Sequence, residues 1–295
     1  MLSLEEQVAR GVLMCPRTKQ ILTRRGDVLS AGEYEYKILN GVPILLTDKN
    51  LIEQYSKPSD PMSISYAEFD QQKSGFRKMV DNFQDYASRD YRTKQSIAAF
   101  DALVQPLGKD SFALSVGGGP RRHHETFLNV NIGPFPNVDI VADAHMLPFP
   151  DNSVDAIFCE AVLEHLRWPH KATAEMFRVL KPGARIFACT PFMQAYHGYP
   201  HHYQNFTLTG HVCMFEDAGF KVSESGVCVG PMVAMVDLAT QFAANLTPRF
   251  MRRLSYWLVR IPGAWIRMLD KRLNRAHYAF CLASATYLLA EKPKA

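Results

Sequence analysis

Apolar runs and helical patterns alternate along the chain from residue 111 onwards. Each short apolar run is followed by a turn or a polar segment, which predicts a buried strand, and residues 170–180 and 208–218 predict helices. Lys181-Pro182-Gly183 and Gly219 are expected to end those helices. Strands that alternate with helices are typical of an α/β fold with a parallel sheet covered on both faces. The expected strands are residues 112–116, 128–132, 138–141, 156–159, 185–189, 221–229 and 285–291.

The residues before this α/β domain show two other patterns. Short apolar runs around the Asn40-Gly41 turn predict a small β unit. The segment that follows is polar and aromatic, with little glycine, which predicts a helical linker or lid. The expected strands of the β unit are residues 21–22, 34–39 and 42–46, and the expected divisions of the chain are 1–47, 48–109 and 110–295.

A helical insertion is expected at residues 231–280, between the last two strands. Its first part, Pro231–Leu246, is mostly apolar and has a single polar stripe that includes Asp237, which predicts a largely buried helix. Apolar residues then recur at helical spacing, and Pro262-Gly263 is expected to break this second helix.

The positive charge of the chain is concentrated in the same insertion. The net charge is +4, but residues 247–277 alone carry +7, with Asp270 as the one acid among eight basic residues. Basic residues that interleave with apolar residues and two tryptophans suit an anionic membrane surface. A helical cap over the active site, with solvated arginines, is the alternative, and the two are compatible. No nucleic-acid partner is expected, because the charge does not lie on a polar face.

Cysteine usage and the first residues favour a cytoplasmic protein. None of the six cysteines forms a C-x-x-C pair, so neither a disulfide framework nor a structural zinc site is implied. Residues 1–6 lack the basic start and apolar stretch of a signal peptide. There is no run of about 18 uncharged apolar residues that could span a bilayer. We expect a cytoplasmic location, with peripheral contact at the inner membrane face through residues 247–277.

One loop, residues 190–203, is rich in titratable and aromatic side chains and follows the expected strand 185–189. Loops at the carboxyl ends of parallel strands carry the chemistry of open α/β folds. Histidine titrates near neutral pH and can take a proton from a nucleophile. A metal is not expected, because no carboxylate or cysteine lies near these histidines in the sequence. The candidate bases are His197, His201 and His202, and the candidate substrate contacts are Tyr196, Tyr199 and Tyr203; hydrogen bonding within the loop and packing are their alternative roles.

Four blocks occur in a fixed order in this domain. They are Gly117-Gly118-Gly119, the D-A-x-x-L-P-F run at 143–149, the L-E-H-L run at 163–166 and the R-V-L-K-P-G run at 178–183. In this order they resemble class I S-adenosylmethionine-dependent methyltransferases, in the branch that contains quinone-biosynthesis and small-molecule enzymes. The resemblance covers about residues 110–230 and the last strand. It implies a Rossmann-like sheet that is mostly parallel, with the last strand antiparallel.

The resemblance also implies a binding site for S-adenosylmethionine beyond the carboxyl ends of the strands. His165, within the L-E-H-L run, is expected to pack at a helix start. His123 and His124 are expected either in solvent or at the cofactor edge. The implied cofactor contacts are Gly117, Gly118 and Gly119 with the methionine and ribose, Asn131 with the ribose hydroxyls, Asp143 with the adenine amino group, Ala144 and His145 beside the ring, and Glu160 and Ala161 with the methionine moiety.

The chain departs from the family pattern in the first half of the domain. Ser115 stands where an acid is usual, and Asn131 stands where the family has Asp or Glu. Only residues 133–137 separate two expected strands, which leaves no room for a crossover helix.

The resemblance as a whole implies a methyltransferase acting on a hydroxyl or similar nucleophile of a small-molecule, glycan or lipid-linked acceptor. A non-catalytic binding protein on a degenerate methyltransferase fold is the alternative.

The β unit carries a second resemblance. Met14-Cys15-Pro16 and the Gly41–Leu46 run look like the two ends of the zinc-ribbon-like domain found in a tRNA-methyltransferase activator subunit and related bacterial proteins. That domain has two C-x-x-C pairs, but here Cys15 stands alone, with Thr18 in place of its partner and no second pair near Leu29. We expect a metal-free remnant that serves packing or recognition.

Overall fold

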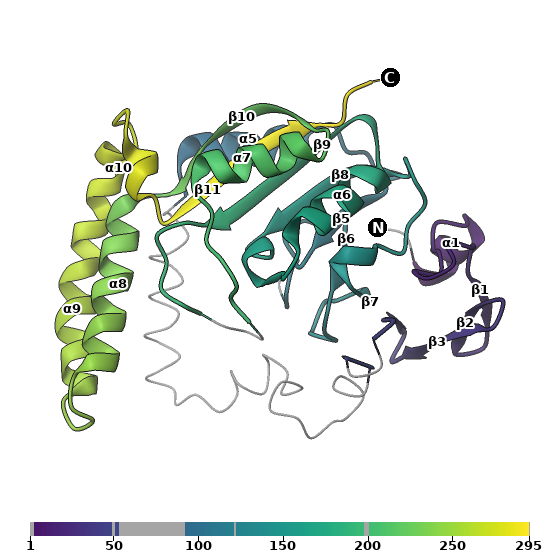
Figure 1. Cartoon of the computed structure of the whole chain (residues 1–295), viewed down its shortest axis with the longest axis horizontal. Coiled ribbons are helices and arrows are strands. Elements are labelled where there is room, and N and C mark those ends of the chain that lie inside the picture. The colour runs from purple at the N-terminus through teal and green to yellow at the C-terminus, as the bar shows by residue number, and fades with distance from the viewer. Residues whose placement is uncertain (1–2, 49–50, 53–91, 121, 198–200, 295) are drawn as a thin grey trace.

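The computed structural model describes residues 3–48, 51–52, 92–120, 122–197 and 201–294. These residues form an eleven-stranded sheet, with a small β unit at one end and a helical hairpin at the other (Figure 1). Residues 53–91 of the linker or lid expected at 48–109, and the candidate substrate contact Tyr199, lie outside the described residues.

Seven strands make up the α/β part of the sheet. The first five strands in spatial order pair in parallel with their neighbours. The last strand of the chain lies between two others and is antiparallel to both. This arrangement confirms the fold expected from the sequence. In spatial order the strands are β7 (Ile140–Ala142), β6 (Phe127–Asn131), β5 (Ala113–Val116), β8 (Val154–Glu160), β9 (Leu180–Pro191), β11 (Ala285–Glu291) and β10 (Lys221–Val229).

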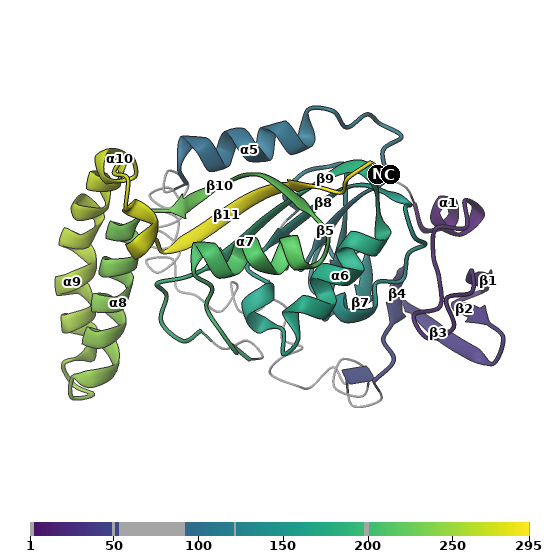
Figure 2. The ribbon, with the colours of Figure 1, turned by 45° about the horizontal axis from the view of Figure 1, so that its top comes forward.

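Helices cover both faces of these strands (Figure 2). α6 (Pro169–Val179) and α7 (Leu208–Asp217) pack on one face, through residues such as Met176 and Phe215. α5 (Lys94–Val104) packs on the other face, where Leu103 joins the cluster that contains Phe158. The sequence placed residues 94–104 in a linker, but this helix buries its apolar side against the sheet and so belongs to the α/β core.

The strand β9 begins earlier than the sequence-based expectation. β9 begins at Leu180, which pairs with Val154, so the expected helix stop Lys181-Pro182-Gly183 runs as extended chain. The connections on either side of β6 contain no helix within the described residues, as their short lengths predicted. Arg122 holds this trimmed region together, because its guanidinium donates to both oxygens of Asp139 at 2.9 and 3.0 Å.

The β unit contains a short helix and four strands, and it extends the main sheet. Ile44 and Leu45 pair in parallel with Val141 and Ala142 of β7. The expected strand at residues 21–22 is wrong, because Ile21 makes only a single bridge to Met14. The elements are α1 (Leu4–Ala9), β1 (Thr23–Arg25), β2 (Val28–Ala31), β3 (Tyr34–Leu39) and β4 (Val42–Leu45).

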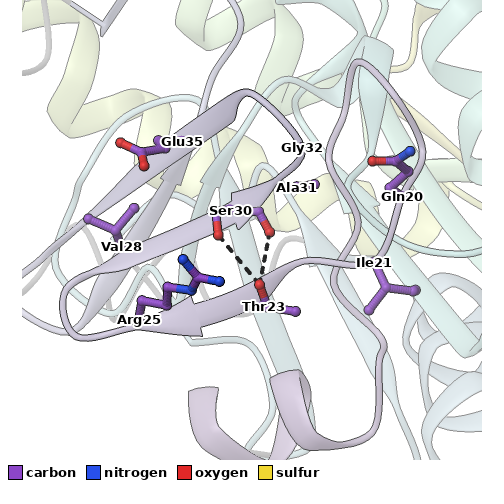
Figure 3. Close-up of a pocket in the computed structure, with 9 residues that line it drawn as sticks. All are labelled: Gln20, Ile21, Thr23, Arg25, Val28, Ser30, Ala31, Gly32 and Glu35. Carbon is purple, nitrogen blue, oxygen red and sulfur yellow. Dashed lines mark hydrogen bonds between the residues drawn. The ribbon is translucent and has the colours of Figure 1, made fainter.

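Cys15 lies in the core of this unit rather than at its surface. Its sulfur is 3.1 Å from the Tyr36 hydroxyl and accepts a hydrogen bond from the backbone N–H of Thr18 at 3.4 Å. Leu29 is fully buried in the same cluster. The outer side of the unit has an open hollow of about 440 Å³, where the Thr23 hydroxyl bonds to Ser30 across two strands (Figure 3). The metal-free role expected for this unit stays a prediction.

The insertion folds as a helical hairpin that begins where β10 ends. Its second helix runs through Pro262, so the expected break is wrong. Gly263 explains the close contact there, since an added Cβ would lie 2.4 Å from a methyl group of Val236 on the facing helix. No helix in the described part of the chain is long and apolar enough to cross a membrane. The elements are α8 (Pro231–Leu246), α9 (Arg252–Ile266), η3 (Arg267–Leu269), α10 (Asp270–Leu273) and η4 (Ala279–Leu282).

Charged groups join the two hairpin helices, and apolar groups face outwards. Asp237 of α8 accepts from Arg260 at 2.7 Å and from the buried Arg267. The cap alternative expected solvated arginines, but these two arginines are engaged in ion pairs with Asp237. The expectation that α8 is largely buried is also wrong for one side. An exposed set of apolar residues, which we call the outer stripe, comprises Met235, Phe242, Leu246, Leu254, Leu258, Ile261 and Trp265.

A buried histidine makes the stability of this fold depend on pH. Burial lowers the pKa of His211 in α7 to about 3, and its Nδ1 lies 3.2 Å from the Thr286 hydroxyl. The unfolded chain binds a proton at this residue below about pH 6.5, whereas the folded chain does not. Stability is thus retained above that pH and lost as the pH falls towards 3, by about 2 kcal/mol at pH 5.

Urea unfolding at pH 7 and pH 5 measures this effect. We expect His211→Gln to lose most of the difference in unfolding free energy between the two pH values. His170→Gln, at an exposed position on α6, is the control and should retain it. Equal pH dependence in both variants would assign the effect to other groups.

Candidate active site

The predicted cofactor residues lie along one edge of the sheet. β5, β6, β7, β8 and β9 are parallel, so the loops that follow them meet at this edge, which we call the carboxyl edge. β10 ends there and β11 begins there, because Ala285 pairs with Pro191 at the end of β9. The helical hairpin therefore starts at the same edge as the predicted cofactor site.

The glycine turn after β5 has two different roles. Gly117 has φ +72°, and an added Cβ would lie 2.1 Å from a methyl group of Val162, so packing requires glycine there. Gly118 is enclosed in a similar way by Ser115 and Asn129. Gly119 has φ +58° and open space where a side chain would be. Of the three, Gly119 thus offers bare backbone to a ligand.

A charged group lies at the end of β8. Glu160 pairs with Arg92, and its other oxygen is 3.6 Å from Nε2 of His123. His123 also packs against Phe158, with ring centroids 4.6 Å apart. Arg92 precedes α5 and bridges to Val229 of β10, which fixes its backbone at the carboxyl edge. His123 therefore lies beside Glu160 at the carboxyl edge, and the cofactor contact expected for it stays a prediction.

Asp143 ends the next strand along the edge and is held by its own loop. Its Oδ1 accepts from the backbone N–H of His145 at 2.9 Å and lies 2.6 Å from Nδ1 of that ring. Burial raises the pKa of Asp143, but the hydrogen bonds from His145 outweigh burial and hold this pKa below its usual value. The carboxylate is therefore ionised and oriented at neutral pH, with Ala144 beside it in η1 (Ala144–Met146).

Asn131 and Ala161 fit the expected pattern less directly. Asn131 is 8% exposed, and its amide oxygen accepts from the N–H of Gly133 at 3.3 Å. Its side chain is thus engaged by its own loop. Ala161 has φ +53°, in the left-handed region that non-glycine residues rarely adopt. The cofactor roles of both residues stay predictions.

The loop after β9 distinguishes the three candidate histidines. His202 uses both ring nitrogens, since Nδ1 accepts from the N–H of His197 at 3.2 Å and Nε2 is 2.7 Å from Oδ1 of Asn205. The His201 ring packs against Tyr203, whereas Tyr196 stacks on His202 and is largely exposed. Their catalytic and substrate roles stay predictions.

His197 differs because it approaches a buried carboxylate. Its Nε2 is 3.9 Å from Oε1 of Glu164, and Nε2 of His165 is 3.8 Å from the same oxygen. The Glu164 carboxylate beside it raises the pKa of the His197 imidazole. We call Glu164, His165 and His197 the Glu164 cluster.

Sequence reasoning missed this cluster. Glu164 and His165 lie in η2 (Leu163–His165) after β8, and His165 was expected only to pack at a helix start. No carboxylate lies near His197 in the sequence, but β8 and β9 are parallel neighbours, so their following loops meet. An acidic residue in the loop after one strand and a histidine after the adjacent strand would have been the signal.

Comparison with known proteins finds similarity to methyltransferases. A family model described as a methyltransferase domain matches residues 124–188. The ubiquinone/menaquinone biosynthesis C-methyltransferase UbiE of Salmonella arizonae is 41% identical over 80 residues, which are 24% of this chain and 32% of that protein. The same values hold for UbiE of Salmonella newport. The chain thus spans about a third of the length of these curated relatives.

Two solved structures are similar over larger parts of the chain. One is the complex between the Haloferax volcanii Trm112 methyltransferase activator and a putative methyltransferase, at 18% identity and a TM-score of 0.44, covering 73% of this chain and 97% of that one. The other is the Burkholderia thailandensis 1,6-didemethyltoxoflavin-N1-methyltransferase, at 13% identity and a TM-score of 0.43, covering 74% and 86%.

The sheet order, the position of the sequence blocks and the matched domain point to one family. The D-A-x-x-L-P-F run holds Asp143 at the carboxyl edge, and Arg178 of the R-V-L-K-P-G run donates to the carbonyls of Leu147 and Phe149. The blocks that carried the resemblance are therefore in contact. Residues 124–188 thus match a methyltransferase domain, and the fold and the contacts between the blocks agree with the resemblance to class I S-adenosylmethionine-dependent methyltransferases.

Proposed function

We propose that this protein transfers the methyl group of S-adenosylmethionine to a hydroxyl or similar nucleophile of a small-molecule, glycan or lipid-linked acceptor. The observation that carries the proposal is the pairing of Glu160 with Arg92 at the carboxyl edge. The methionine part of the cofactor has an ammonium and a carboxylate on one carbon. A carboxylate and a guanidinium side by side are complementary to that pair of charges.

The groups next to this charge pair suit the binding of the ribose and adenine parts of the cofactor. Gly119 leaves open space where a side chain would be, which suits the close approach of a ligand. His145 holds the ionised Asp143 through Oδ1, and the other oxygen, Oδ2, would accept from the adenine amino group. The residues present therefore fit the cofactor. When bound, it supplies an electrophilic methyl group on a sulfonium.

The remaining residues would position the acceptor. The loop after β9 and η2 form the side of the edge next to Glu160, where the Glu164 cluster gathers two imidazoles around one carboxylate. Methyl transfer is an in-line displacement, so the enzyme must align the nucleophile behind the methyl group and remove its proton. An imidazole of the Glu164 cluster would take this proton.

Isothermal titration with S-adenosylmethionine tests the proposal. We expect saturable binding of one cofactor per chain, and methylation of an acceptor when labelled cofactor is incubated with a cell extract. A folded protein that gives no binding heat would overturn the proposal. That result would favour a non-catalytic protein, an alternative motivated by Ser115 and by the engaged amide of Asn131.

We also propose that the hairpin rests on an anionic membrane surface on the cytoplasmic side. The outer stripe consists of apolar side chains that are 47% to 74% exposed, and on α9 they recur at positions 254, 258, 261 and 265, which share one face. Exposed basic residues lie close to the stripe in sequence: Arg249, Arg252, Lys271, Arg272 and Arg275. Apolar contact combined with positive charge is the chemistry of an interfacial helix. Because the hairpin starts at the carboxyl edge, it would bring a lipid-linked acceptor to the site.

Vesicle sedimentation measures this contact. We expect salt-sensitive retention on vesicles with anionic lipid and little retention on neutral vesicles. Leu254→Glu combined with Leu258→Glu should abolish it, whereas Ile97→Glu, at an exposed apolar position on α5, should not. Retention that ignores lipid charge, or self-association through the outer stripe, would contradict the membrane proposal.

A further inference from the structure

Three electron-donating atoms converge at the Glu164 cluster. The Glu164 side chain is fully buried, and neither of its oxygens accepts a hydrogen bond within the described part of the chain. Nε2 of His165 and Nε2 of His197 lie 3.8 and 3.9 Å from one of these oxygens. A buried carboxylate in this state is costly unless a cation compensates it.

Hydrogen bonds on the far side of each ring define which nitrogen carries the proton. Nδ1 of His165 is 2.6 Å from the carbonyl oxygen of His201, and Nδ1 of His197 is 2.9 Å from that of Ala195. A carbonyl oxygen only accepts, so both Nδ1 atoms must donate. In the neutral rings each Nε2 therefore carries the lone pair, at 3.8 and 3.9 Å from the Glu164 oxygen.

This arrangement is the one that proteins use to hold metal-ligating histidines. A backbone carbonyl that accepts from Nδ1–H fixes the tautomer and directs Nε2 to the metal. The separations also favour an ion over a shared proton, because 3.8 and 3.9 Å are longer than a hydrogen bond. Ligands about 2.1 Å from a tetrahedral ion lie roughly 3.4 Å apart. Both oxygen–nitrogen separations, 3.8 and 3.9 Å, are close to that value.

We propose that Glu164, His165 and His197 bind one divalent transition-metal ion. Two imidazoles and one carboxylate suit Zn²⁺, Co²⁺ or Fe²⁺, and three protein ligands leave coordination positions open. The ligand atoms of the three residues all lie within 4.8 Å of one another. His202 supports the site from outside, because its Nδ1 accepts from the backbone N–H of His197.

The metal would deepen the proposed function, on which this step rests. An acceptor hydroxyl bound at an open position would lose its proton to solvent water more readily, since a divalent ion lowers the pKa of a bound hydroxyl. His197 would then act as a ligand rather than as a free base. Metal binding itself requires neither cofactor nor acceptor, so it is measured separately from methyl transfer.

Titration of the metal-stripped full chain with Co²⁺ tests the site. We expect one Co²⁺ per chain with visible absorption bands of a nitrogen- and oxygen-ligated ion, displacement by Zn²⁺, and no displacement by equimolar Mg²⁺. Glu164→Gln should weaken binding by more than about 100-fold. His197→Gln, at a partly exposed ring, should do the same without disturbing the core.

His201→Ala is the matched control, because it removes a histidine of the same loop but leaves the carbonyl that His165 uses. This variant should keep full metal binding. The proposal is overturned if the folded wild-type chain binds no Co²⁺, or if all three variants bind it equally. S-adenosylmethionine binding without metal binding would overturn this inference alone, and metal binding without cofactor binding would overturn only the proposed function.

Discussion

Replacing Arg92 with alanine is expected to weaken S-adenosylmethionine binding by about 3 kcal/mol, or roughly 100-fold. The variant removes the cation that would meet the cofactor carboxylate. It also leaves Glu160 without its paired guanidinium, so two carboxylates would then face each other. Arg92→Lys should restore part of the affinity, because an ammonium keeps the charge but not the fork geometry.

Isothermal titration measures the affinity of both Arg92 variants for S-adenosylmethionine and for S-adenosylhomocysteine, the cofactor product that remains after methyl transfer. Lys94→Ala is the control, since it removes an exposed cation two residues away. A thermal melt of each variant is needed, because the Arg92 backbone bridges to Val229. Unchanged affinity in a folded Arg92→Ala protein would remove the charge pair from the cofactor site.

Arg178→Ala is expected to lower the free energy of unfolding by about 3 kcal/mol. This guanidinium donates to the carbonyls of Leu147 and Phe149 and to the carboxylates of Glu175 and Asp151, at 2.6 to 3.0 Å. Its removal leaves two carbonyls in a largely buried loop without their donor. For a domain of this size the melting temperature should fall by about 6–12 °C.

Arg185→Ala provides the matched control for this prediction. Arg185 also pairs with an acid, but the pair with Glu291 is 3.8 Å long and exposed, so its loss should cost at most about 0.5 kcal/mol. Similar melting temperatures for the two variants would show that the R-V-L-K-P-G run is not a structural anchor. Cofactor affinity should also fall in Arg178→Ala, because the anchored loop follows Asp143 and η1.

Patterns that depend on neighbouring residues were readable from the sequence. The strands β3, β10 and β11 have the expected boundaries, since each is an extended run between turn signals. The helix break expected at Pro262 was wrong because the sequence does not show that α9 packs on α8. Gly263 allows close packing there, and α9 continues through Pro262. Residues 94–104 were misjudged because their role depends on a sheet face that is assembled later in the chain.

The candidate site divides in the same way. The sequence could place Gly119, Asp143 and Glu160 at the carboxyl edge because each follows its own strand and belongs to a local block, while their cofactor roles stay predictions. The Arg92 contact and the Glu164 cluster were not found, since each joins segments that only the strand order brings together. Sequence blocks thus locate the edge of a site, whereas contacts between loops of adjacent strands determine its chemistry.

The pairing of β4 with β7 has a consequence for the handling of the chain. Without residues 42–45, β7 would present unpaired N–H and C=O groups, and such an open strand invites pairing with other molecules. The β unit covers that strand from within the same chain. Removal of the first 45 residues would therefore turn β7 into an open edge strand and favour aggregation of the remaining domain.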